Sequence, residues 1–259
     1  MTRQPAVAGT FYPANPEQLH RQLQQYLSNA EASTTPPKAI IAPHAGYIYS
    51  GPIAATAYAR LKPAHQTITR VVLIGPSHHA AFRGLAVSRA KTFTTPLGQI
   101  PVDQQSIQAV LKLPFVEIIE QAHAYEHSLE VQLPFLQEVL DDFNIVPIVA
   151  GDATPEQVSE VLEMLWGGSE TLIVISSDLS HYHDYATATR LDKATSAAIE
   201  RLQYEELGYE SACGKTGVSG LLKLARDKSL AIKTIDLRNS GDTAGDKQRV
   251  VGYGAYVIE

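Results

Sequence analysis

The sequence predicts an α/β protein whose central, mostly parallel but mixed sheet is flanked by helices on both faces. Two observations lead to this prediction: short apolar runs recur along the chain, and segments with helical periodicity separate most of them. Strands that are buried on both faces have continuous apolar sequences, and helices usually connect such strands. The chain has 259 residues and no internal repeat. This length is enough for one large core, so we expect a single domain over residues 1–259.

Five apolar runs are expected to form the strands of this sheet. They comprise residues 39–42, 70–75, 143–151, 171–177 and 231–237. Each run is short and contains isoleucine, valine or leucine, as expected of a buried strand. Residues 84–103 differ, because they read as extended or hairpin-like segments at one side of the sheet. Residues 249–259 alternate between faces and predict a late strand that is antiparallel or lies near an edge.

Six segments are expected to form helices, the first before the strands and the other five between them. They comprise residues 16–27, 52–61, 104–113, 128–140, 155–166 and 185–202. In the first of them, Leu19, Leu23 and Leu27 recur every four residues and therefore share one helix face. Pro16 and Glu17 stand at its start, where a helix tolerates proline and favours an acidic side chain.

The composition argues against nucleic acids and membranes as partners. The formal net charge is -6 and the pI is about 5.8, whereas nucleic-acid and anionic-membrane binding depend on basic patches. The chain contains no apolar run of the roughly 20 residues that a membrane span requires, and its first residues do not resemble a secretory signal. The one cysteine, Cys213, excludes an intramolecular disulfide. We therefore expect a cytoplasmic protein.

Histidines and acidic residues follow several of the predicted strands. Ligands of open α/β sheets bind outside the carboxyl ends of the strands, so polar side chains that gather there indicate a site. The candidates at strand ends or at an adjoining helix start are His44, His78, His79, His127, Glu130, Asp178, His181, His183 and Asp242. A lone histidine after a strand is more often a loop or capping residue. Their joint occurrence at one predicted edge nevertheless favours a functional site.

The residue types favour a metal centre. The sequence contains no G-x-S-x-G elbow, P-loop, C-x-x-C or H-E-x-x-H motif. Two histidines and a carboxylate from different strands match the triad that binds non-haem Fe(II), and zinc accepts the same ligands. Cys213 could act as a nucleophile. A free cysteine is more commonly a small buried residue, and we favour that interpretation.

Six motifs occur in an order that resembles one known family. They are AGTFYP, AIIAPHAGYIYSG, VVLIGPSHH, EHSLEVQLPF, VISSDLSH and ACGKTG. Together they resemble the Memo-like family, also called the AmmeMemoRadiSam system protein B family, over roughly residues 5–258. The resemblance implies a fold like that of the class III extradiol dioxygenases, which open catechol rings with Fe(II) and O2.

The resemblance also implies a set of site residues. A metal pocket would be formed by His44, His78 and Asp242, with Asp246 in the same NSGDTAGD stretch as the alternative to Asp242. His181 would take the place of the dioxygenase general base. Some animal members carry cysteine at the third ligand position. Animal members are described as phosphotyrosine-peptide adaptors and as iron- or copper-binding redox proteins.

Two functions remain open from the sequence. In the first, the chain is a dioxygenase-like oxidoreductase that acts on an unknown small molecule with Fe(II), with zinc or copper as alternatives. His181 would then move protons and Asp178 would orient it or cap the next helix. His127 would either bind substrate or begin the helix that follows it. In the second, the chain is a binding or adaptor protein whose pocket holds a metal or a peptide. The sequence names neither the substrate nor the oligomeric state.

Overall fold

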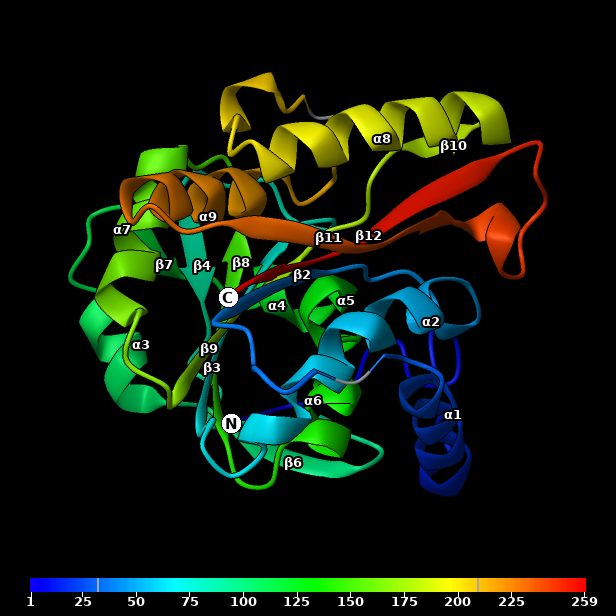
Figure 1. Ribbon diagram of the computed structural model, residues 1–259. Coiled ribbons are helices and arrows are strands. Elements are labelled where there is room, and N and C mark those ends of the chain that lie inside the picture. The colour runs from blue at the N-terminus through cyan, green and yellow to red at the C-terminus, as the bar shows by residue number, and fades with distance from the viewer. Residues whose placement is uncertain (32, 209) are drawn as a thin grey trace.

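A nine-stranded mixed sheet forms the centre of the protein (Figure 1). The computed structural model describes residues 1–31, 33–208 and 210–259. Hydrogen-bonded neighbours follow the order β10-β12-β2-β9-β3-β8-β4-β7, and β11 pairs with β12. The strands of this sheet are β2 (Ala39–Ala42), β3 (Arg70–Pro76), β4 (Leu85–Val87), β7 (Val116–Ile118), β8 (Asn144–Ala150), β9 (Thr171–Ser176), β10 (His181–His183), β11 (Ile232–Asn239) and β12 (Val250–Ile258).

The middle of the sheet is parallel, as the continuous apolar runs predict. β2, β9, β3 and β8 are consecutive parallel neighbours. Antiparallel pairs flank them, since β12 runs antiparallel to β2 and β4 runs antiparallel to β8. β12 is the late antiparallel strand that the alternating C-terminal sequence predicts. The predicted fold class, a mostly parallel mixed sheet with flanking helices, is confirmed.

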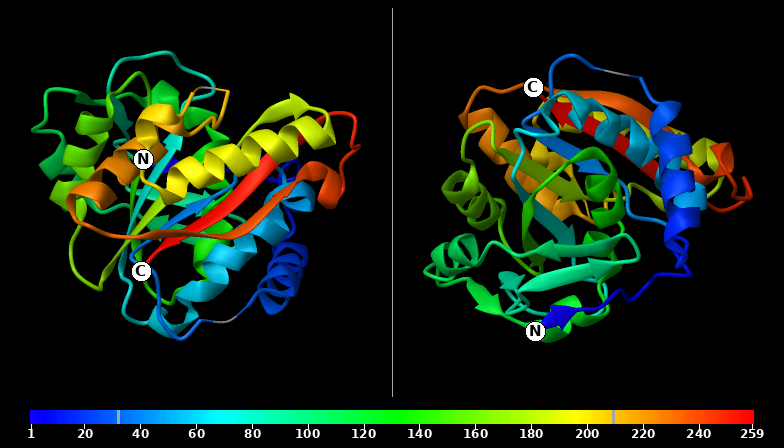
Figure 2. Two further views of the ribbon diagram at one scale, coloured as in Figure 1. Left: turned by 45° about the horizontal axis from the view of Figure 1, so that its top comes forward. Right: turned by 90° about the horizontal axis from the view of Figure 1, so that it is seen from below.

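The segment between β3 and the next helix adds a second, small sheet. It contributes β5 (Thr92–Thr95) and β6 (Gly98–Pro101), which pair antiparallel, while β1 (Thr2–Arg3) pairs parallel to β5. The right-hand view of Figure 2 shows this sheet near the N-terminus, at the opposite end of the molecule from the β11–β12 pair.

Helices cover both faces of the main sheet. They are α1 (Pro16–Ser28), α2 (Tyr47–Tyr58), α3 (Gln104–Val110), α4 (Glu120–Ala124), α5 (His127–Glu130), α6 (Leu133–Val139), α7 (Pro155–Leu165), α8 (Tyr185–Glu200) and α9 (Lys215–Asp227), with 3-10 turns η1 (Ala59–Ala64), η2 (Tyr204–Glu206) and η3 (Ser240–Asp242). The long β11–β12 pair lies between α8 and α2 (Figures 1 and 2). No helix among the described residues is both long and apolar enough to cross a bilayer.

The helices differ from the sequence prediction in several places: α2 begins at Tyr47 rather than at residue 52, and α4 is an additional short helix. The predicted helix 128–140 is divided into α5 and α6, and Pro134 lies in the first turn of α6. Proline restricts the residue before it and lacks an N–H, so a new helix begins more readily there than an existing one continues. Helix α9 was not predicted, because Gly217 and Gly220 weaken its helical signal. A Cβ at Gly220 would lie 2.2 Å from Val158 Cγ1 of α7, so the glycine permits close packing of the two helices.

Candidate metal centre

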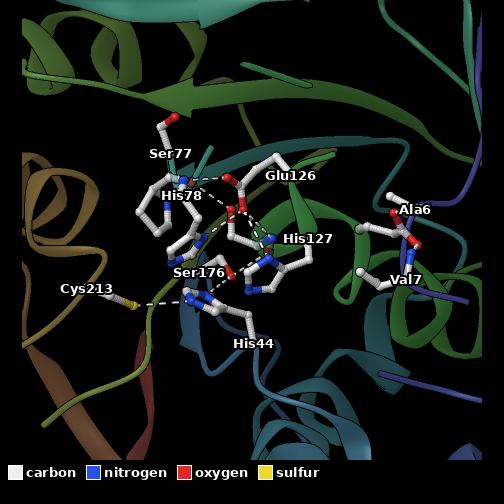
Figure 3. A network of polar contacts seen from close by, with 12 residues as sticks. Ala6, Val7, His44, Ser77, His78, Glu126, His127, Ser176 and Cys213 are labelled. Atoms are coloured by element: carbon white, nitrogen blue, oxygen red, sulfur yellow. Dashed lines mark hydrogen bonds and ion pairs between the residues drawn. The ribbon is translucent and has the colours of Figure 1, made fainter. Parts of the chain in front are cut away.

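Three side chains that are far apart in the sequence meet at the carboxyl edge of the parallel strands. His44 follows β2, His78 follows β3, and Cys213 precedes α9. The potential ligand atoms of these three residues all lie within 4.8 Å of one another. Figure 3 shows His44 next to Cys213, with His78 and His127 close by. This cluster could hold a metal ion.

His44 is fixed in place by the strand that runs beside its own. It is 2% exposed, and its backbone N–H donates to Asp178 Oδ1 over 2.7 Å. Asp178 follows β9, the parallel neighbour of β2, so the pairing of these two strands sets the position of the imidazole. Burial, together with the nearby His78, lowers the pKa of His44 to about 3. The ring is therefore neutral at physiological pH, as a metal ligand must be.

A buried hydrogen-bond network determines which nitrogen of His44 carries the proton. Gln132 Nε2 donates to the Pro43 carbonyl at 2.9 Å and to Ser176 Oγ at 2.8 Å. The Ser176 hydroxyl donates its own proton to the Ser128 carbonyl at 2.6 Å. Since this hydroxyl has no second proton to give, His44 Nδ1, at 2.9 Å, must donate to it. His44 Nε2 is therefore unprotonated and presents a lone pair.

Glu126 orients His78 in the same way. Its carboxylate accepts the backbone N–H of His78 at 2.6 Å and the Nδ1–H at 2.8 Å, and it also accepts the N–H of Ser128. Burial alone would raise the pKa of Glu126, but the hydrogen bonds and the charge of His78 lower it to about 2. An ionised carboxylate on Nδ1 directs Nε2 of the same ring away from Glu126, which is the arrangement typical of metal-binding histidines.

Cys213 supplies the third group. Its Sγ lies 3.2 Å from His44 Nε2 and accepts the backbone N–H of Asp178 at 3.3 Å. Burial, and then the nearby Asp178, raise the pKa of the thiol, so Cys213 donates its S–H to His44 here, and a bound cation would favour the thiolate instead. Gly214 makes this approach possible, because a Cβ at that position would lie 2.5 Å from the Ser176 carbonyl oxygen.

Asp242 is not brought to His44 and His78 in this structure. Its carboxylate accepts the Tyr185 hydroxyl at 2.6 Å and the backbone N–H of Asn239 at 2.9 Å, which closes the turn η3. The expected convergence of these three residues is not seen among the described residues; the group that could hold a metal ion contains Cys213 beside the two histidines. The reason is local, because the turn after β11 uses the Asp242 carboxylate as a cap. Asp246, the alternative, lines the pocket beside the cluster and accepts the N–H of Gln248.

His44 and His78 line a pocket with a volume of about 610 Å³. The expected site residues Asp178, His181 and His127 all line it. The His127 ring stacks on His78 with 4.5 Å between centroids and contacts Phe11 at 4.7 Å. Burial, together with the neighbouring histidines, lowers the pKa of His127 to about 4. His127 also begins α5, as one of the two interpretations expects; that it binds substrate stays a prediction.

Three residues that support the cluster are not among the sequence candidates for the site. Glu126 and Ser176 orient the two imidazoles, and Gln132 orients Ser176. For Cys213, a member of the cluster itself, the sequence favours a small buried residue over a nucleophile. Glu130, which was a candidate for the rim, is fully buried. It pairs with Arg3 instead. The three supporting residues and the cysteine all lie in motifs quoted above: Glu126 and Gln132 in EHSLEVQLPF, Ser176 in VISSDLSH and Cys213 in ACGKTG.

Replacing Ser176 with alanine should lower metal affinity without unfolding the protein. The variant removes the group that holds the proton on His44 Nδ1, and loss of such supporting hydrogen bonds costs roughly 10- to 100-fold in affinity. Nitrogen NMR of the metal-free protein should show His44 losing its single tautomer. Ser219→Ala is the matched control, because Ser219 is a buried serine whose hydroxyl has no partner among the described residues. Equal metal affinity in both variants would contradict the assignment.

Comparison with known proteins identifies relatives along the whole chain. A family model described as "Memo-like protein" matches residues 3–257. Proteins described as "MEMO1 family protein" are similar: one from Aquifex aeolicus is 38% identical, covering 97% of each chain, and one from Ignicoccus hospitalis is 40% identical, covering 98% of each. Among solved structures, uncharacterized protein JW3007 from Escherichia coli K12 has a TM-score of 0.54 and 15% identity, covering 85% of this chain and 98% of that one. This last likeness supports the fold alone.

Proposed function

The chain belongs to the Memo-like protein family, and from that premise we propose that it is a metal-dependent oxidoreductase acting on a small molecule. The metal would be held by His44, His78 and Cys213 at the base of the open pocket. One observation carries the proposal: buried acceptors occupy Nδ1 of both imidazoles. Nε2 of each ring is therefore left for a ligand, and that of His44 lies 3.2 Å from the thiol.

The donor set favours a first-row transition metal. Imidazole and thiolate suit iron, copper and zinc, whereas magnesium and calcium prefer oxygen ligands. We propose Fe(II) as the resident ion, with copper or zinc as the alternatives. The exchange of an expected carboxylate for Cys213 makes the set softer than the two-histidine, one-carboxylate triad. A bound iron would supply open coordination positions and one-electron chemistry beside the pocket.

The chain's own residues can hold and move a proton at the wall of this pocket. Asp178 is 4% exposed, and burial raises the pKa of its carboxyl group even though a backbone N–H and three histidines oppose that shift. His181 lines the same pocket. A carboxyl group with a raised pKa beside an imidazole is a pair suited to general acid–base work. We propose His181 as the proton carrier and Asp178 as its partner.

The test is ligand binding and turnover in Fe(II)-loaded protein. Three protein ligands leave positions open, so the iron-loaded protein should bind nitric oxide, an O2 surrogate, with a new electron paramagnetic resonance signal. His181→Ala should keep both metal and nitric oxide but lose at least about 100-fold in any turnover, the usual contribution of a general acid or base. His65→Ala is the control, because His65 is exposed and pairs with Asp141.

The competing function is a binding protein that uses the same pocket. If the chain is such a binding protein, the metal should have a filled coordination sphere. His181→Ala should then change partner affinity and nothing else. Iron-loaded protein that binds no exogenous ligand would therefore favour the binding protein over the oxidoreductase.

A further inference from the structure

Arg249 lines the candidate pocket, and among the described residues its guanidinium N–H groups have no hydrogen-bond partner. It is the one arginine or lysine among the described residues that line this cavity. Its guanidinium lies over the Tyr182 ring, 4.5 Å from the centroid. In the part of the chain that the structure describes, Arg249 forms no ion pair with a carboxylate and no side-chain hydrogen bond. Stacking on a ring fixes the guanidinium plane and leaves its N–H groups free for an anion.

The chain adopts an unfavourable backbone conformation to place Tyr182 there. Tyr182 has φ of 63°, a region that residues with a bulky side chain rarely occupy. The pairing of β10 with β12 shifts register at this point: His181 pairs with Val251 and His183 with Val250, so Tyr182 is an extra, bulged residue. Bulges redirect side chains and are common beside functional sites. The Tyr182 ring is 62% exposed, so core packing does not explain its position.

Four large aromatic side chains are among the residues that line the pocket. Phe11, Tyr49 and Tyr253 line it together with Tyr182. Rings of this kind pack well against another flat ring, by offset stacking or edge-to-face contact. The cavity, at about 610 Å³, is in the range that holds a small organic ligand. An aromatic surface with one unpaired cation is complementary to a ring that carries one negative charge.

We propose that the pocket takes a small aromatic carboxylate, with the carboxylate on Arg249 and the ring among the aromatic walls. This proposal deepens the proposed function and rests on it for the identity of the pocket as a substrate site. A carboxylate matches the planar fork of arginine with two parallel hydrogen bonds. A phosphate ester matches less well, because phosphate sites commonly gather several cations. Here Arg249 is the one arginine or lysine among the described residues that line the pocket, and the acidic Asp178 and Asp246 line it too.

The test compares isosteric ligands on the full chain, with and without bound metal. Isothermal titration should show 4-hydroxybenzoate binding at least about tenfold more tightly than neutral 4-hydroxybenzamide, since a charge-assisted hydrogen bond contributes that much or more. Arg249→Gln should reduce the ratio to about one. Lys247→Gln should leave it unchanged, because Lys247 stacks on Tyr185 and does not line the cavity. Cyclohexanecarboxylate should bind more weakly than 4-hydroxybenzoate in the unmodified protein.

Several results would overturn the proposal. These are equal affinity for the acid and the amide, an unchanged ratio in Arg249→Gln, tighter binding of 4-hydroxyphenyl phosphate than of the carboxylate, and absence of binding by every aromatic ligand at millimolar concentration. Metal content, measured on the same samples, separates the two ideas. Carboxylate selectivity in protein that takes up no metal would leave the substrate class standing while the oxidoreductase proposal fails. Metal uptake without carboxylate selectivity would leave the oxidoreductase proposal standing while the proposed substrate class fails.

Discussion

His44→Ala should lower metal affinity by more than about 100-fold and leave the fold intact. Changes to groups that only support a ligand already cost 10- to 100-fold, and this variant removes a ligand itself. His44 is buried with its Nε2 facing Cys213, so the truncated site would keep only two of three donors. Metal content after anaerobic loading and dialysis, together with a competition titration, gives the affinity.

A matched histidine serves as the control for this variant. His20→Ala removes an exposed imidazole that contacts Glu138 on the surface, and metal affinity should not change. Circular dichroism of both variants checks that the fold is retained. Full stoichiometric metal in His44→Ala, with affinity equal to that of His20→Ala, would show that the metal is bound elsewhere.

Glu130→Gln should destabilise the protein by about 3–5 kcal/mol, the cost of breaking a buried ion pair from one side. Glu130 is fully buried and forms an ion pair with Arg3. It also accepts the N–H groups of Ala6 and Val7 and the Tyr12 hydroxyl. Glutamine keeps the size of the side chain but removes the charge and replaces one acceptor oxygen with a donor. Urea unfolding measures the change in free energy.

The comparison for this variant is an ion pair on the surface. Glu163→Gln breaks the contact with Lys228, where the Glu163 side chain is 57% exposed, and should cost at most about 1 kcal/mol. If the two variants cost the same, Glu130 does not anchor the N-terminal segment. This segment carries Phe11, which contacts His127. A large loss of stability in Glu130→Gln should therefore be accompanied by a change in the chemical shifts of the His127 ring.

The fold and two of the three cluster residues follow from sequence patterns. Continuous apolar runs predict parallel strands, and the carboxyl ends of β2, β3 and β9 place His44, His78 and Asp178 at one edge of the sheet. These positions depend on the backbone path alone. A residue directly after a strand lies at the edge of the sheet, and the apolar pattern of the sequence predicts where the strand is.

The third member of the cluster depends on side-chain detail that patterns do not contain. Asp242 and Cys213 both lie in turn-rich stretches, and the direction of a side chain in a turn depends on its capping bonds. Asp242 caps Asn239 and is thereby turned away, whereas Cys213 reaches His44 because Gly214 packs against the Ser176 carbonyl. Cys213 and Gly214 directly precede α9, the helix whose glycines weaken its helical signal in the sequence.

X-ray absorption of Fe(II)-loaded, full-length protein tests the proposed donor set of His44, His78 and Cys213 most directly. We expect imidazole scattering together with one sulfur neighbour at roughly 2.3 Å, a typical metal–thiolate distance. The sulfur contribution should disappear in Cys213→Ser while the imidazole scattering remains. A first shell of nitrogen and oxygen alone in the unmodified protein, or a sulfur neighbour that persists in Cys213→Ser, would contradict the proposed metal centre.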